Sequence, residues 1–207
     1  MNRSLGSVAS VVIAIATVAF AISMLIGAAP LSWATSMILS WGYVVLASSL
    51  AAEAADSRKA AAYSGLAFAV IYAGYVSAVY FVQLTTVLQN AATADILMQL
   101  SYAQHGSLMF NLDLLGYGMM AASTFFIGLS MVAASTPDRV LRVFLMLHGV
   151  FAPACVLLPI FNVFGSMGGA SGDVIGVAVL LVWCVYFFPI AVLAFRHFRM
   201  GRLQARP

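Results

Sequence analysis

Charged residues are scarce in this chain of 207 residues, where they make up only 7% of the sequence. A soluble domain carries roughly 25% charged residues, so the soluble globular class is excluded. Hydrophobic residues account for 64% of the chain, and the mean hydropathy is +1.05. The composition therefore predicts an all-α integral membrane protein.

Cysteine is also rare, and the usual catalytic signatures are missing. Cys155 and Cys184 both fall inside apolar stretches, which excludes a surface disulfide framework. The sequence has no HExxH, GxSxG or CxxC motif, so an intramembrane hydrolase or a thiol oxidoreductase would lack its usual parts. No Glu, Lys or Arg lies in the core of a predicted span. The charged relays that are typical of ion-coupled pumps are therefore missing. We therefore favour a protein that is not an enzyme and predict no cofactor and no metal site.

Six apolar runs are long enough to cross a bilayer, at about 20 residues per span. They cover approximately residues 8–27, 33–51, 60–88, 112–134, 140–164 and 174–195. The first run is too long for the core of a signal peptide, so we interpret it as a retained span. The chain is thus predicted to be a single six-helix transmembrane bundle over residues 1–207. The two halves could form inverted repeats, but they do not align convincingly.

Prolines and one polar stretch modify this pattern. Pro30 is predicted to end the first helix, because a proline disfavours helical geometry in the residue before it. Pro153 and Pro159 predict a kinked fifth span, and Pro189 a kinked sixth span. Residues 91–110 mix polar and apolar side chains, which indicates a short amphipathic helix in the outer interface.

All nine Lys and Arg residues flank the same side of the predicted spans. They are Arg3, Arg58, Lys59, Arg139, Arg142, Arg196, Arg199, Arg202 and Arg206. Because basic residues in short loops stay on the cytoplasmic side, both termini are predicted to be cytoplasmic. The basic residues give a pI near 9.1, and membrane orientation and contact with anionic lipid headgroups explain them. The bilayer is therefore the expected partner, and no nucleic-acid partner is predicted.

The most suggestive polar pattern lies in the fifth span. His148, Cys155 and Asn162 recur every seven residues, which predicts one stripe along a helix. His148 has two interpretations: a group that binds a proton or ligand, or a neutral histidine bonded to a neighbouring helix. His148 and Cys155 would lie about 10 Å apart along the axis, too far to share one metal ion. His105 and His197 fall outside the spans, so haem would lack a second buried histidine.

Two further groups of polar residues are candidates. Tyr72, Tyr75, Gln83 and Thr86 share one face of the third span, where they could line a pathway or join helices. On the outer side, Asp95, His105 and Asp113 could build a metal or substrate site. The simpler interpretation is that Asp113, with Asn111, caps the fourth span and that the others are solvated.

The run NLDLLGYGMMAASTFFIGLSM and the later run LRVFLMLHGVFAP lie between Asn111 and Pro153. This region resembles a family of small bacterial inner-membrane proteins with about six helices and unknown function. The resemblance implies a multi-pass protein of the bacterial cytoplasmic membrane, and it implies no activity or catalytic residue.

The sequence favours a bundle that binds or passes a small neutral or apolar molecule. Its interior would be lined by Tyr72, Tyr75, Gln83, His148 and Asn162. An alternative is an accessory subunit that docks on a larger membrane complex, or on further copies of itself, through its apolar faces. A third is an intramembrane enzyme acting on lipid, quinone or haem.

Overall fold

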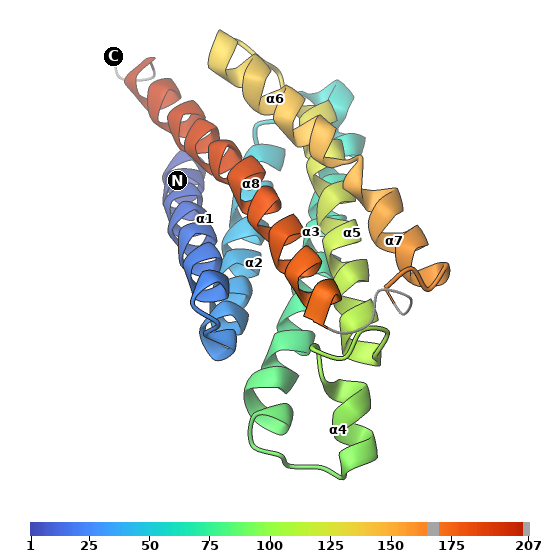
Figure 1. Ribbon diagram of the computed structural model, residues 1–207. Helices are drawn as coiled ribbons and strands as arrows, with labels where there is room; N and C mark the ends of the chain where they lie inside the picture. Colours follow the sequence, from blue (N-terminus) through green and yellow to red (C-terminus); the bar gives the residue numbers. More distant parts are fainter. Residues whose placement is uncertain (165–169, 205–207) are drawn as a thin grey trace.

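The computed structural model describes residues 1–164 and 170–204, and within these ranges all of its secondary-structure elements are helices (Figure 1). Six of its helical stretches are long and apolar enough to cross a membrane. The elements are α1 (Asn2–Leu25), α2 (Ala29–Ala51), η1 (Asp56–Arg58), α3 (Lys59–Val82), η2 (Gln83–Val87), α4 (Ala94–Leu100), α5 (Leu108–Ser130), α6 (Thr136–His148), α7 (Phe151–Ile160) and α8 (Ala170–Gln204). The predicted all-α bundle with six spans is therefore confirmed.

The start of α1 and the end of α8 lie at the same end of the bundle (Figure 1). That end also holds η1 and the start of α6, so it gathers the described segments that carry Lys and Arg. We call it the basic end. The opposite end holds the α1–α2 turn, η2, α4 and the start of α5, and we call it the distal end.

A turn of three residues joins α1 to α2. Gly27 has a φ of +69°, a left-handed conformation that costs glycine little. The prediction that Pro30 ends the first helix is wrong. Pro30 lies in the first turn of α2, where its missing N–H has no helical partner to lose.

α2 is rich in hydroxyl groups, and most of these bond to their own helix. Ser32, Ser40, Ser48 and Ser49 each donate to a carbonyl three or four residues earlier, at 2.8 Å. Because the carbonyls accept these bonds, the hydroxyls are paired without water. A helix of modest hydropathy can thus lie inside an apolar bundle.

α5 is the central helix and packs closely against α3, α6 and α7. A methyl group on Gly65 of α3 would come within 2.8 Å of Ile127 on α5. A methyl group on Gly128 would come within 2.7 Å of Met146 on α6. Small residues are typical of membrane helix interfaces, where close van der Waals contact holds helices together.

The fifth span is two helices rather than one kinked helix. α6 ends at His148 and α7 begins at Phe151. Pro153 cannot donate to the Gly149 carbonyl, which instead accepts from the Ala152 N–H at 3.1 Å. The break therefore lies one turn before Pro153, and it disrupts the predicted stripe through Cys155 and Asn162.

The interfacial segment predicted over 91–110 contains a helix of only seven residues, α4. It lies at the distal end and belongs to none of the six candidate spans (Figure 1). The chain after α4 then folds back toward the bundle and leads into α5.

Candidate functional site

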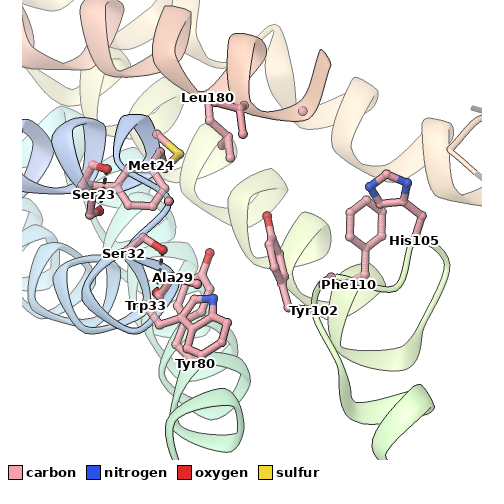
Figure 2. Close-up of a pocket in the computed structure, with 15 residues that line it drawn as sticks. Ser23, Met24, Ala29, Ser32, Trp33, Tyr80, Tyr102, His105, Phe110 and Leu180 are labelled. Carbon is pink, nitrogen blue, oxygen red and sulfur yellow. Dashed lines mark hydrogen bonds between the residues drawn. The ribbon is translucent and has the colours of Figure 1, made fainter. Parts of the chain in front are cut away.

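The distal end of the bundle contains a cavity of about 270 Å³, which we call the distal pocket. It lies between the α1–α2 turn, the end of α3, the chain preceding α5, and the distal part of α8 (Figure 2). Its walls are mainly apolar and include five aromatic side chains: Phe20, Trp33, Tyr80, Tyr102 and Phe110. His105, Ser23 and Ser32 add polar atoms.

Gln83 holds one wall of the pocket in place. Its amide nitrogen donates to the Leu100 carbonyl at 2.7 Å, and its amide oxygen accepts from the Tyr102 N–H at 2.8 Å. Ser107 donates to the Ser101 carbonyl at 2.7 Å in the same connection. Gln83 is only 1% exposed. It therefore supports the site by positioning Tyr102, and its polar atoms are already bonded.

Four tyrosines surround a buried carboxyl group below the pocket; we call this the tyrosine cluster. Asp113 is 2% exposed, and its Oδ1 has no hydrogen-bond partner. Tyr72, Tyr80, Tyr102 and Tyr117 are all near enough to Asp113 to interact with its carboxyl group. Tyr80 and Tyr102 belong to both the cluster and the pocket wall.

Tyr102 lies in the connection between α4 and α5, outside the spans. Burial raises the pKa of its phenol above the ordinary value, and the charge of Asp113 raises it further. Tyr102 therefore stays protonated at neutral pH and can donate a hydrogen bond. Its ring packs against Tyr80 and Phe110, with centroids 5.8 and 5.9 Å away.

His148 joins three helices near the middle of the bundle and is 1% exposed. Trp183 on α8 donates from Nε1 to His148 Nε2 at 2.9 Å. His148 Nδ1 lies 2.9 Å from Thr124 Oγ1 on α5, and Thr124 donates its own proton to the Ala121 carbonyl. Because indole N–H can only donate, His148 is the neutral tautomer with its proton on Nδ1. Both ring nitrogens are thus bonded, which matches the structural interpretation of His148.

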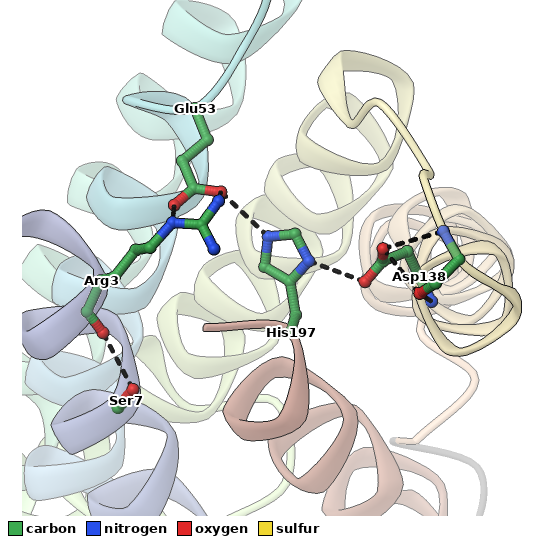
Figure 3. Close-up of polar contacts among 6 residues, drawn as sticks. Arg3, Ser7, Glu53, Asp138 and His197 are labelled. Atoms are coloured by element: carbon green, nitrogen blue, oxygen red, sulfur yellow. Dashed lines mark hydrogen bonds and ion pairs between the residues drawn. The ribbon is translucent and has the colours of Figure 1, made fainter. Parts of the chain in front are cut away.

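An ion network closes the basic end (Figure 3). His197 on α8 contacts Asp138 of α6 through Nδ1 at 2.7 Å, and Glu53 after α2 through Nε2 at 3.1 Å. Arg3 at the start of α1 pairs with Glu53 at 3.0 Å. Asp138 also forms a capping box with Ser135. We call these four ionisable residues the basic-end clasp, and it ties together the termini and α6.

The structure separates most of the residues that the sequence singled out. Tyr72 and Asp113 meet in the tyrosine cluster, whereas Tyr75 is half-buried on α3 beside Gly116. Asn162 is exposed beyond the end of α7, with a φ of +50°, so it is not brought together with His148. Asp95 is exposed on α4.

Asp113 does not cap α5, so that interpretation is wrong. The helix starts a turn earlier than predicted, and Ser107 is its cap, accepting from the Phe110 N–H at 3.1 Å. His105 does line the distal pocket, with its ring 5.0 Å from that of Phe110. The three outer-side candidates thus form no common site. Among residues 1–164 and the described part of α8, no group of three His, Cys, Asp or Glu side chains could hold a metal ion.

Sequence reasoning missed Trp33, Tyr80, Tyr102 and Phe110 as pocket residues. The available signal was the concentration of aromatic residues near the predicted distal ends of several spans. Comparison of the chain with family models, with curated proteins and with solved structures finds no match, so function is inferred from the site alone.

Proposed function

We propose that the protein binds a small, largely apolar molecule in the distal pocket. The observation that carries this proposal is the aromatic cavity of about 270 Å³, just below the roughly 300–1,000 Å³ of typical ligand sites. Ligand sites combine apolar walls with a few polar groups, as this pocket does. The phenols of Tyr80 and Tyr102 would bond one polar group of the ligand, and the aromatic rings would cover the rest of it.

The pocket itself can be tested by filling it. Gly176 lines the pocket, and a side chain at this position would meet nothing within 4 Å. Gly176→Leu is expected to fill part of the cavity, so a molecule that co-purifies with the wild-type protein in mild detergent is lost by about tenfold or more. Mass spectrometry of solvent extracts measures the bound molecule.

Gly74→Leu is the matched control. Gly74 also has open space around it, but it lies on α3 and is not part of the pocket. It should keep the wild-type complement of bound molecules. Equal retention in both variants would place any ligand elsewhere, and a wild-type protein that yields only detergent and bulk lipid would contradict the binding role.

We also propose that the protein resides in a bacterial cytoplasmic membrane, with its basic end in the cytoplasm. The support is the charge asymmetry and the resemblance noted above. In a background without Cys155 and Cys184, a cysteine at Ser57 should be shielded from an impermeant thiol reagent added to intact cells. A cysteine at Ala94 should be labelled. Both positions are exposed, so the reverse labelling would invert the proposed orientation.

One observation favours the accessory-subunit alternative. None of the ten residues of α7 is buried, and the helix packs mainly against α5. Much of its apolar surface is therefore open to lipid or to a partner helix. Recovery of a stoichiometric membrane-protein partner together with an empty pocket would favour this role over ligand binding.

A further inference from the structure

Asp113 carries a carboxyl group inside a membrane-spanning helix. It lies in the second turn of α5, is 2% exposed, and leaves Oδ1 without a partner. Buried polar atoms are almost always paired, and ionisable groups within spans are typically functional. Packing alone therefore does not explain why this oxygen is unpaired.

The surroundings of Asp113 supply hydrogen bonds but no positive charge. The titratable groups that face it are Tyr72 and Tyr80 on α3, Tyr102 before α5, Tyr117 on α5 and Cys155 on α7. All of these are neutral when protonated. Among the described residues, no basic side chain pairs with Asp113. An uncompensated carboxylate in an apolar interior is costly, and a bound proton removes that cost.

The distal pocket gives a proton a way to reach this group. Tyr80 lines the pocket and lies near enough to interact with Asp113, and Tyr102 lines the pocket and interacts with Tyr80. We propose that Asp113 is a reversible proton-binding site, which exchanges its proton through the distal pocket by way of Tyr80. The incoming proton bonds to the Tyr80 oxygen while the original phenol proton moves to the carboxylate. The phenol is thereby regenerated and the carboxyl group is neutral.

This site would regulate ligand binding, a consequence that rests on the proposed function of the pocket. A molecule in the pocket covers Tyr80 and Tyr102, so it closes the route by which Asp113 exchanges its proton. A ligand bonded to these phenols also competes with Asp113 for them. Because coupling between two sites is reciprocal, the protonation of Asp113 then changes ligand affinity.

Infrared spectroscopy of the purified full-length protein tests the proposal without any ligand. A protonated carboxyl group has a C=O stretching band, which shifts when deuterium replaces the proton. Subtracting the spectrum of Asp113→Asn should reveal this band in the wild-type protein within the range of about pH 5 to 9. Asp113→Glu keeps a carboxyl group and serves as a second variant if Asp113→Asn does not fold.

The exchange route is tested by transfer into D₂O. The Asp113 band should shift about tenfold more slowly in Gly176→Leu, which fills the pocket, and in Tyr80→Phe, which removes the phenol. Gly74→Leu and Tyr63→Phe are the controls, because Gly74 and the exposed Tyr63 are on α3 but outside the pocket.

Two results would overturn the proposal. The first is the absence of an Asp113 carboxyl band over the whole pH range, which would show that the group binds no proton there. The second is wild-type exchange in both Gly176→Leu and Tyr80→Phe, which would show that the proton uses another route. Neither result affects retention of a co-purified molecule, so failure of this inference is distinguishable from failure of the binding role.

Discussion

Replacing His148 by alanine is expected to lower the free energy of unfolding by about 3 kcal/mol, a value within the range observed when a large buried side chain is removed. The substitution leaves the Trp183 N–H without its acceptor. It also opens a cavity between Phe151, Tyr186 and Phe187, whose rings lie 5.4, 5.9 and 5.6 Å from the imidazole. Unfolding in detergent, followed by circular dichroism, measures the loss.

Two variants make this test specific. His148→Gln keeps a donor and an acceptor, so it should cost less than alanine. Leu147→Ala removes an adjacent side chain that is 54% exposed, and it should change stability little. A His148→Ala protein with wild-type stability would mean that the three-helix junction does not hold the bundle together.

The second large effect is expected at the basic-end clasp. His197→Phe keeps a ring but removes both donors, and Asp138 and Glu53 then face each other without the intervening imidazole. We expect a loss of about 2 kcal/mol, because His197 and Asp138 are mostly buried while Glu53 is partly solvated. Lys59→Gln breaks an exposed pair with Asp56 and should cost about 0.5 kcal/mol or less.

The clasp also predicts how stability changes with pH. Each nitrogen of His197 faces a carboxylate oxygen, so both bonds require the doubly protonated imidazolium. His197 stabilises the fold while its ring holds both protons. This stabilisation is lost as the pH rises and one proton leaves the ring. Melting temperatures measured from about pH 5.5 to 8.5 should fall with rising pH in the wild-type protein. This slope should be smaller in His197→Phe, and an identical slope in both proteins would assign it to another group, such as Asp113.

The membrane spans could be predicted because hydrophobicity directly reports the cost of placing residues in lipid. The ends of the helices were less predictable, since they depend on local hydrogen bonds. Ser107 caps α5 one turn before the apolar run begins, and this shift moved Asp113 from an expected cap into the interior. The break at Gly149 likewise depends on which carbonyl Pro153 leaves without a donor.

The candidate site was the least predictable part of the molecule. The pocket combines side chains from α1, α2, α3, α8 and the chain before α5, and no spacing along one helix relates them. His197 was expected outside the spans, whereas the last candidate span of the structure, Val174–Arg199, includes it. Its two acidic partners come from distant segments. Contacts of this kind depend on how helices are arranged around α5, which periodicity within a single helix does not report.

The short α1–α2 turn has a consequence for how the chain enters the membrane during synthesis. α2 has a mean hydropathy of 1.4, against 2.5 for α1, and it carries several hydroxyl groups. On its own it is the weaker candidate for partitioning from the translocon into lipid. Because only three residues separate the helices, α2 emerges beside a strongly apolar partner and can pack against it at once. The pair is therefore suited to integrate as a helical hairpin, with α1 supplying most of the driving force for both.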